Sequence, residues 1–469
     1  MRYISTRGRA PELAFDDVLL SGLARDGGLY VPAEWPHFNA DDLTEMKTLG
    51  YNDLAFRVMR PFIGGTIDDD ALKAIIARAY ATFEGGEVAP LVNIGDDIHL
   101  MELFHGPTLA FKDVAMQMLG GLFDHVLQAR GTRVTIVGAT SGDTGSAAIE
   151  ACRDKDTLDV FMLHPDGRVS EVQRRQMTTV LSDNVHNLAI RGTFDDCQDL
   201  VKAMFNDETF RDRHNLSAVN SINWARVMAQ IVYYVHAALH LGAPEREVSF
   251  TVPTGNFGNV FAGYAAMKMG IPVKRFIVAA NANDILARFF ESGEMRTDAV
   301  VPTLSPSMDI QISSNFERLL FDMMGRDGAR VESTLTTFRE EGRFRVDEGM
   351  LDTVREKFDA ARFDDNETTE TIRALHEDNG MLIDPHTAVG LAAAKARHEH
   401  DGTPMVVLAT AHPAKFPDAV ETATGVRPTL PERMNDLYER EERAVTVDND
   451  LKAVERLVDE TLGAEAAAS

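Results

Sequence analysis

Cysteine is scarce in this sequence, which has only Cys152 and Cys197 among 469 residues. Two thiols cannot build a disulfide framework, and a metal site would need more ligands. We therefore expect no metal and a reducing compartment. Long apolar runs are also missing. Residues 227–242 form the most apolar long stretch, and polar side chains interrupt it. This stretch is too short for a membrane span and predicts a buried helix.

Positive charge is in short supply as well. The chain has 47 lysines and arginines against 73 aspartates and glutamates, a formal net charge of −26. This charge argues against binding to nucleic acids or to anionic membranes. An anionic ligand would have to be held locally, by backbone N–H groups and a few cations. With no apolar signal segment in residues 1–10, we expect a cytoplasmic protein, monomer or homodimer, that acts on a small molecule.

The hydrophobic pattern changes along the chain, and the length predicts two or three domains. Residues 1–95 contain amphipathic helices with acidic first turns, which predicts a small helical N-terminal domain. Later residues alternate buried apolar strands with helices, which predicts two α/β domains, 96–245 and 246–469. Such alternation is typical of doubly wound, mostly parallel sheets.

The first stretch with chemical content is GATSGDTGSAA, residues 138–148. It follows an apolar strand and leads into a helix, an arrangement that binds anions because backbone N–H groups and the helix dipole face the ligand. The candidate ligand-binding residues are Thr140, Ser141, Gly142, Asp143 and Thr144. The alternative is a plain strand–helix turn that Ser141 or Asp143 caps.

A second turn of this kind lies in VPTGNFGNVFAGYAA, residues 252–266. Its candidate residues are Gly255, Asn256, Phe257, Gly258 and Asn259. The turn matches neither the dinucleotide pattern nor the P-loop pattern, and a capped turn remains the alternative. Two such turns after two parallel strands predict one ligand, or a pair of ligands, with two anionic ends beyond the carboxyl ends of the strands.

Lys112 stands where the loop of LFHGPTLAFKDVAMQMLGGLF, residues 103–123, gives way to an apolar helix. The alternative for a lysine is a solvated helix position. The apolar neighbours favour desolvation, which lowers the pKa of a lysine and makes its amine a nucleophile and a base. A buried nucleophilic lysine together with phosphate-holding turns indicates pyridoxal 5′-phosphate.

A fourth stretch, LATAHPAKFPDA, spans residues 408–419. An expected strand ends at Thr410, and His412 and Lys415 follow in a loop. The alternatives are an ordinary strand residue for Thr410 and a loop histidine with satisfied hydrogen bonds for His412.

Several long segments resemble the threonine synthase family, in the family's order. They are ELFHGPTLAFKD, TSGDTGSAA, NSINWARVMAQIVYY, PTGNFGN, SPSMDIQISSNFERLLFD and TAHPAKF. The resemblance runs from about residue 1 to about residue 430. The sequence is most similar to the longer form of the enzyme, which has an extra N-terminal domain. It implies a fold-type II pyridoxal-phosphate enzyme with a tryptophan synthase β-like fold.

The resemblance also implies roles for individual residues. Lys112 matches the Schiff-base lysine, and residues 255–259 match the turn that holds the cofactor's phosphate. Thr410 matches the hydroxyl residue facing the pyridine nitrogen, and residues 140–145 match the loop that receives the substrate carboxylate. Many fold-type II relatives have Asn where this chain has Asp143. An ionised carboxylate cannot donate to the cofactor's phenolate oxygen as an amide can, so the resemblance does not extend to that contact.

The implied reaction converts O-phospho-L-homoserine and water to L-threonine and phosphate, the last step of threonine biosynthesis. Lys112 would take the α proton while the cofactor acts as an electron sink. Lys415, Ser141 and Thr144 are the candidates for the substrate phosphate. A serine or threonine dehydratase, or a phospho-lyase that yields 2-oxobutyrate, would use the same lysine and turn. A non-catalytic binding protein is a further alternative, and a dehydrogenase would need a glycine pattern that the chain lacks.

Overall fold

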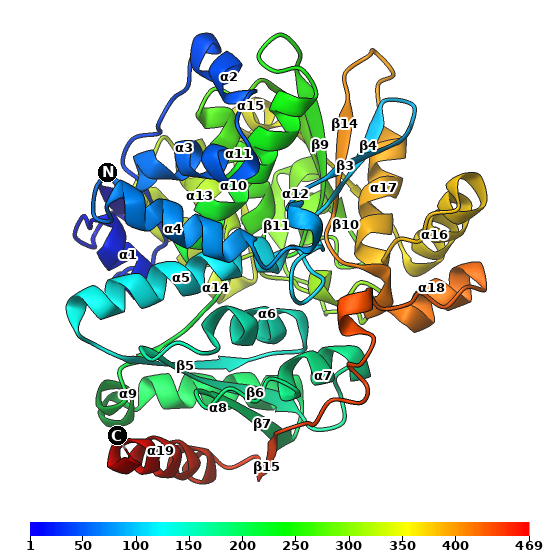
Figure 1. The fold of residues 1–469 in the computed structure, drawn as a ribbon. Coiled ribbons are helices and arrows are strands. Elements are labelled where there is room, and N and C mark those ends of the chain that lie inside the picture. The colour runs from blue at the N-terminus through cyan, green and yellow to red at the C-terminus, as the bar shows by residue number, and fades with distance from the viewer. Residues whose placement is uncertain (469) are drawn as a thin grey trace. The chain divides into compact units, whose positions relative to one another are not determined.

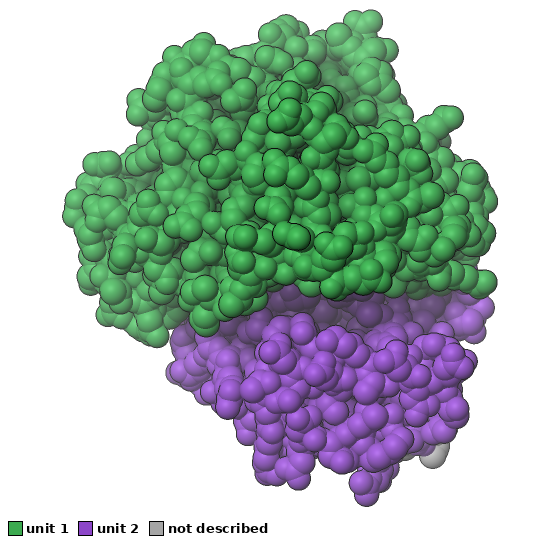
Figure 2. Space-filling view, turned by 180° about the vertical axis from the view of Figure 1, so that it is seen from behind, with its two compact units in different colours: residues 1–115, 221–429 green, residues 116–220, 430–469 purple. Residues whose placement is uncertain are grey.

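The computed structural model describes residues 1–468, and the contacts within the chain form two compact units (Figures 1 and 2). Unit 1 consists of residues 1–115 and 221–429. Unit 2 consists of residues 116–220 together with those from 430 onward. Each unit has its own sheet.

The sheet of unit 1 has six strands in the order β13-β10-β9-β14-β4-β3. All neighbouring pairs are parallel except β3 with β4, which are antiparallel. The strands are β3 (Leu91–Gly95), β4 (Ile98–Glu102), β9 (Val248–Pro253), β10 (Val273–Ala280), β13 (Phe358–Arg362) and β14 (Met405–Ala409). β9 and β14 are buried along their whole length, as expected for parallel strands covered on both faces.

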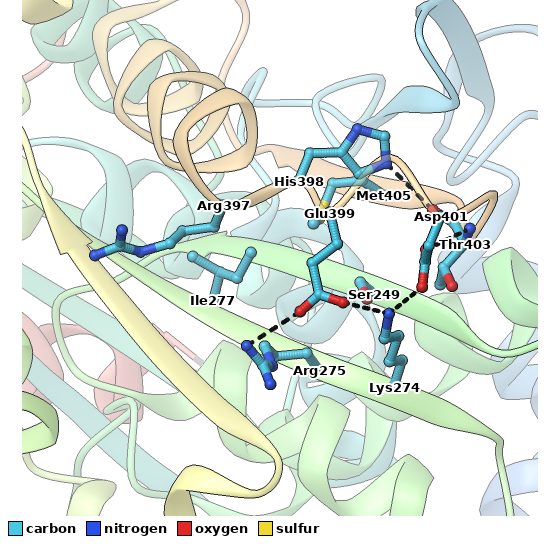
Figure 3. Close-up of a pocket in the computed structure, with 10 residues that line it drawn as sticks. All are labelled: Ser249, Lys274, Arg275, Ile277, Arg397, His398, Glu399, Asp401, Thr403 and Met405. Carbon is cyan, nitrogen blue, oxygen red and sulfur yellow. Dashed lines mark hydrogen bonds and ion pairs between the residues drawn. The ribbon is translucent and has the colours of Figure 1, made fainter.

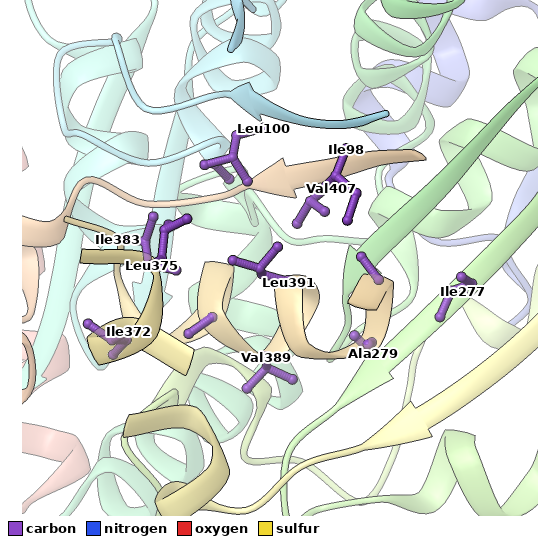
Figure 4. Close-up of a cluster of buried hydrophobic side chains, with 14 of the residues drawn as sticks. Ile98, Leu100, Ile277, Ala279, Ile372, Leu375, Ile383, Val389, Leu391 and Val407 are labelled. Carbon is purple, nitrogen blue, oxygen red and sulfur yellow. The ribbon is translucent and has the colours of Figure 1, made fainter. Parts of the chain in front are cut away.

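Helix α17 (Pro385–Arg397) packs its small apolar residues against this sheet. Asp384 caps its N-terminus by accepting from Thr387 N at 3.1 Å, and Pro385 at the first position favours the start of the helix. Val389 and Leu391 join strand residues such as Val407 in a buried hydrophobic cluster of the unit (Figure 4). Helices α10 (Trp224–His240) and α11 (Gly258–Lys268) pack against each other.

The N-terminal residues of unit 1 are mainly helical, as the sequence predicts. The short antiparallel pair β1 (Tyr3–Ser5) and β2 (Tyr30–Pro32) accompanies four helices. These are α1 (Phe15–Ser21), α2 (Ala40–Met46), α3 (Tyr51–Ile63) and α4 (Asp69–Tyr80). Asp68 caps α4 by accepting from Ala71 N at 2.8 Å, and α3 packs on α10.

The remaining elements of unit 1 lie between β10 and β14 or follow β14. They are α12 (Ile285–Ser292), β11 (Glu294–Arg296), α13 (Phe316–Met323), α14 (Gly328–Glu341), β12 (Arg343–Arg345), α15 (Glu348–Arg355), α16 (Asp365–Asn379) and α18 (Pro417–Thr424). β11 and β12 form an antiparallel pair of their own.

The sheet of unit 2 is parallel throughout, in the order β15-β7-β6-β5-β8. Its strands are β5 (Val134–Ala139), β6 (Leu158–Pro165), β7 (Val185–Arg191), β8 (Leu216–Ser217) and β15 (Val445–Asp448). Its helices are α6 (Asp143–Cys152), α7 (Glu171–Thr178), α8 (Phe194–Asn206), α9 (Glu208–Arg213) and α19 (Leu451–Ala468), and α5 (Lys112–Arg130) enters it from unit 1. A core around Phe161, Leu188 and Val454 joins both parts of the unit.

The doubly wound α/β fold with mostly parallel sheets is confirmed. The apolar stretch 227–242 forms most of the buried helix α10, as predicted. Within residues 1–468, no helix has the length and apolar character needed to cross a bilayer. The division into domains 1–95, 96–245 and 246–469 stays a prediction.

Candidate active site

Three neighbouring parallel strands of unit 1 lead into the predicted cofactor residues. β9, β14 and β4 are adjacent in the sheet and run in the same direction. Residues 254–257 follow β9, residues 410–416 follow β14, and residues 103–111 follow β4. Because parallel strands end at the same edge, these three loops share the carboxyl edge of the sheet, where open α/β sheets bind ligands.

Lys112 is the first residue of α5 and is 8% exposed. The residues before it pair with the loop after β14. Phe111 N donates to Thr410 O at 2.8 Å, and His412 N donates to Leu109 O at 3.0 Å. Leu109 is fully buried with a φ of 64°, in the left-handed region, so the surrounding packing holds the turn. Two segments that lie 300 residues apart by number thus fix the position of the lysine.

Asp113 orders the loop that precedes Lys112. The side chain is fully buried, and its two oxygens accept from Thr108, from N at 2.8 Å and from Oγ1 at 2.6 Å. Lys415, 1% exposed, donates from Nζ to Thr108 O at 2.7 Å. A Cβ at Gly106 would lie 2.5 Å from Asp113 Cβ, so this position needs glycine. Lys415, predicted to bind substrate phosphate, therefore contacts the lysine loop.

The turn between β9 and α11 has an uncapped helix N-terminus. Phe257 adopts φ 60°, and its side chain makes no cap at the start of α11 because it has no polar atom. The first N–H groups of a helix have no partner within the helix, so this end can receive an anion. Gly255 lies tight against another loop, because a Cβ there would be 2.8 Å from Ser307 O.

Asn259, in the first turn of α11, has a buried donor without a hydrogen-bond partner among the described residues. Its Oδ1 accepts from Tyr233 at 2.5 Å and from Tyr234 at 3.0 Å. Its Nδ2 is buried and has no hydrogen-bond partner among residues 1–468. Because buried amides are nearly always hydrogen-bonded, this Nδ2 indicates an acceptor that the protein itself does not supply.

Sequence reasoning missed Arg226, which lies on α10 in the same unit. The residue is 4% exposed, and its Nε and Nη1 have no hydrogen-bond partner within the described part of the chain. Burial lowers the pKa of Arg226 to about 10, which still leaves the group charged near neutral pH. A buried cation with unsatisfied donors suits an anionic ligand. The available signal was one arginine inside the apolar run NWARVMAQIVYY.

In unit 2, the predicted carboxylate loop follows β5 and starts α6. Thr140 Oγ1 accepts from Gly142 N at 3.0 Å and from Gly145 N at 2.9 Å, so this hydroxyl shapes the turn. Asp143 begins α6 and is 7% exposed, and its Oδ1 accepts from Gln173 Nε2 at 2.8 Å. A Cβ at Gly142, whose φ is 144°, would lie 2.5 Å from the Gln173 amide carbon.

The other predicted residues of these loops differ in exposure. Ser141 is exposed and Thr144 is half-buried, so both hydroxyls lie nearer to solvent than Thr140 does. Thr410 is 6% exposed directly after β14. His412 Nδ1 accepts from Ala414 N at 3.1 Å, which agrees with the alternative of a loop histidine with satisfied hydrogen bonds.

A separate pocket of unit 1 lies at the opposite ends of these strands (Figure 3). Its lining includes Ser249, Lys274 and Met405, which lie near the starts of β9, β10 and β14. Lys274 forms ion pairs with Glu399, at 2.6 Å, and with Asp401. Arg275 and Arg397, which also line it, pair with Glu399 and Asp359. Because carboxylates already neutralise these cations, this pocket offers less to an anion than the loops at the carboxyl edge do. No group of three or more metal-ligating side chains occurs in the described residues.

Comparisons with known proteins agree with this geometry. Three family models match: "Threonine synthase N terminus" over residues 2–80, "Pyridoxal-phosphate dependent enzyme" over residues 88–337, and "Threonine synthase, C-terminal" over residues 387–458. The threonine synthase of Pseudomonas aeruginosa is 56% identical over 98% of both chains.

The chain belongs to the threonine synthase family.

Solved structures of the family share the fold closely. The pyridoxal-phosphate-bound threonine synthase of Brucella melitensis superposes with a TM-score of 0.97, at 54% identity over 98% of this chain and 99% of that one. Threonine synthase from yeast superposes with a TM-score of 0.94, at 41% identity over 98% and 99% of the two chains.

Pyridoxal phosphate, the cofactor of this family, suits the residues of unit 1. The N–H groups at the uncapped start of α11 and Asn259 Nδ2 are hydrogen-bond donors of the kind that suits phosphate oxygens. Lys112 is a buried amine on the same edge of the sheet. Holding this cofactor requires hydrogen-bond donors for its phosphate dianion and an amine that can react with its aldehyde carbon.

Proposed function

We propose that the protein converts O-phospho-L-homoserine and water to L-threonine and inorganic phosphate. The observation that carries this proposal is the buried Lys112 at the start of α5, in a chain of the threonine synthase family. The phosphate-accepting turn on the same edge of the sheet supports it. Pyridoxal phosphate, when bound, supplies an electron sink for the negative charge that develops on the substrate's α carbon.

Lys112 would hold the cofactor and then move protons on the substrate. Its side chain is buried at the start of α5, 8% exposed. The neutral amine can take the proton from the α carbon and return protons along the carbon chain. Loss of phosphate from the γ carbon and addition of water at the β carbon complete the conversion.

The cofactor's phosphate would lie at residues 255–259, against the first N–H groups of α11 and Asn259 Nδ2. The Thr410 hydroxyl, 6% exposed, is the candidate to face the pyridine nitrogen. A hydroxyl can donate a hydrogen bond to this nitrogen and leave it unprotonated, whereas a carboxylate would favour its protonation.

The phosphate of the substrate needs a donor set of its own, and Arg226 is the first candidate. Its Nε and Nη1 carry N–H groups without a partner among the described residues, and such groups can donate to phosphate oxygens. The guanidinium keeps its charge near neutral pH. Lys415 is a weaker candidate, because its Nζ donates to a backbone carbonyl. Ser141 and Thr144 also remain candidates for this phosphate. Residues 140–144 stay the proposed loop for the substrate carboxylate, since α6 begins without a side-chain cap.

A product assay tests the proposal. The cofactor-loaded protein is incubated with O-phospho-L-homoserine, and phosphate, threonine and 2-oxobutyrate are quantified. We expect threonine and phosphate in equal amounts. Phosphate with 2-oxobutyrate would instead identify a phospho-lyase of the same fold, and no phosphate release would reject the substrate.

Two lysine variants accompany the assay. Lys112→Ala should lose both products, because no other group is proposed to take the α proton. Lys202→Ala removes an exposed lysine on α8, whose side chain is 67% exposed, and should keep wild-type turnover. Turnover of phosphohomoserine by Lys112→Ala at the wild-type rate would remove the central role given to this lysine.

A further inference from the structure

Residues 313–318, here called the brace, hold the backbone of the cofactor-phosphate turn from behind. Ser313 Oγ donates to Gly255 O at 2.7 Å. Asn315 donates twice to Asn256 O, from its backbone N and from its side-chain Nδ2, each at 3.0 Å. A Cβ at Gly258 would lie 3.2 Å from Asn315 Nδ2, so the brace also approaches the first residue of α11.

These contacts decide which backbone groups of the turn can face a phosphate. A carbonyl oxygen repels a phosphate oxygen, whereas an N–H group attracts it. The brace engages the carbonyls of Gly255 and Asn256, and a carbonyl that accepts from the brace is directed toward the brace. The N–H groups at the start of α11 then remain as the anion-binding face of the turn.

Arg318 fixes the orientation of the Asn315 amide. Its Nη1 donates to Asn315 Oδ1, which leaves Nδ2 as the side of the amide that faces Asn256 O. If the amide turned over, it would set two donors against each other and an oxygen against an oxygen. Glu317, the neighbouring carboxylate, is engaged elsewhere, with Arg7 at 3.2 Å.

The remaining donors of Arg318 tie the brace to two other segments. Nε donates to Tyr30 O at 3.0 Å, and Nη2 donates to Ile222 O at 2.6 Å. The side chain is fully buried, and burial lowers the pKa of Arg318 to about 9. A fully buried guanidinium that binds three acceptors from three segments is a rigid joint, because its planar fork fixes their mutual geometry.

We propose that Arg318 is a positioning residue for the cofactor's phosphate, which it serves through Asn315 without touching the phosphate. The inference rests on the proposed role of residues 255–259. It also gives the N-terminal segment a part in cofactor binding, since the Tyr30 carbonyl is one of the three acceptors.

Comparison of two ligands tests this role. The bound cofactor is first removed from the protein with hydroxylamine. The protein is then titrated with pyridoxal phosphate or with pyridoxal, and the absorbance of the bound ligand is followed. Arg318→Met and Asn315→Asp should weaken pyridoxal phosphate about tenfold to a hundredfold, the range for one hydrogen bond to a charged group. Affinity for pyridoxal, which has no phosphate, should stay within about threefold of wild type.

Arg326→Met is the matched control for a general effect on the N-terminal segment. Arg326 also donates to carbonyls of that segment, to Pro32 O at 3.1 Å and to Ala33 O at 2.7 Å, but not to Asn315. Arg326→Met should therefore leave the preference for pyridoxal phosphate over pyridoxal unchanged. If Arg318→Met does not fold, Asn315→Asp and Ser313→Ala measure the same preference with a smaller change to the core.

Equal losses for both ligands in the brace variants, or no loss, would overturn the positioning role. Asn259→Ala separates this failure from a failure of the proposed site. If Asn259→Ala lowers the preference for pyridoxal phosphate while the brace variants do not, the inference about Arg318 is wrong and the turn stands. If Asn259→Ala also leaves the preference unchanged, the assignment of the turn is wrong.

Discussion

Replacing Arg226 with methionine should stabilise the ligand-free protein and weaken its reaction with O-phospho-L-homoserine. The two effects have one cause. Arg226 is 4% exposed, and its Nε and Nη1 find no hydrogen-bond partner in the described residues. The ligand-free protein therefore contains a buried cation with two nitrogens that have no hydrogen-bond partner among the described residues. Methionine has a similar length and no charge, so it removes both the penalty and the ligand contact.

The two magnitudes follow from the same contacts. An unsatisfied buried polar group destabilises a protein by about 1–3 kcal/mol. The smaller methionine leaves a cavity that offsets part of this gain, so we expect a net stabilisation of about 1 kcal/mol. With ligand, two hydrogen bonds from a charged group are worth about 1.5–3 kcal/mol each. Their loss should lower kcat/KM by a factor of at least about 100.

The assay pairs thermal unfolding without ligand with steady-state kinetics, and it uses Arg318→Met as the contrasting variant. Both arginines are buried, but Arg318 donates to Tyr30 O, Asn315 Oδ1 and Ile222 O. Its loss removes these three hydrogen bonds, so Arg318→Met should lower Tm while Arg226→Met raises it by about 1–3 °C. A drop in Tm for both variants, or a kcat/KM of Arg226→Met within about threefold of wild type, would refute the reasoning.

Three further outcomes are expected. Gly255→Ala should lower retention of pyridoxal phosphate about tenfold or more in dialysis, because a Cβ there would lie 2.8 Å from Ser307 O. Gln173→Leu should destabilise the protein by about 2 kcal/mol in urea unfolding, because it leaves the buried Asp143 carboxylate without its 2.8 Å donor. Burial lowers the pKa of His236 to about 4. As pH falls below about 6.5, the histidine therefore binds a proton in the unfolded chain before it does in the folded one. The free energy of unfolding of the wild type should fall by about 2 kcal/mol by pH 5, and His236→Phe should not show this loss.

Each of these variants has a control of the same chemical type. Gly349→Ala adds a Cβ with ordinary contact at 3.5 Å and should keep the cofactor. Gln128→Leu removes a similar amide–carboxylate contact, to Asp124 at 3.1 Å, but at an exposed position, and should change stability by less than about 0.5 kcal/mol. His37→Gln changes an exposed histidine and should leave the pH dependence of unfolding as it is in wild type. If a control variant shows the same effect as the variant it is matched to, the physical explanation given for that variant is wrong.

Local patterns were enough to predict most of the fold and part of the candidate site. The apolar runs at β5, β6 and β9 predicted strands because a buried parallel strand needs apolar residues on both faces. The small residues of the two turns predicted helix starts that can receive anions. Lys112 was selected by its apolar neighbours, and the structure confirms that it is buried. All of these signals lie within a few residues of the feature they predict.

Hydrogen-bond satisfaction could not be predicted in this way. Arg226 and Arg318 both lie beside apolar residues in the sequence, and neither local pattern says whether the buried donors will be paired. In the structure, Arg318 binds carbonyls of distant segments, whereas Nε and Nη1 of Arg226 have no hydrogen-bond partner in the part of the chain that the structure describes. Whether a buried donor meets an acceptor depends on which chain segment packs beside it, and that segment can lie hundreds of positions away.

The sequence alone determined the α/β class and the family, and it predicted the lysine and the glycine turns of the site, because periodicity and motif are properties of short segments. Only the tertiary structure decided that β15 pairs with β7, so that the residues from 430 onward join unit 2. The tertiary structure also decided that Lys415 holds the loop before Lys112 and that the brace holds the turn predicted to bind the cofactor's phosphate. These are contacts between residues far apart in the chain, and the packing of the whole chain fixes them where local preference does not.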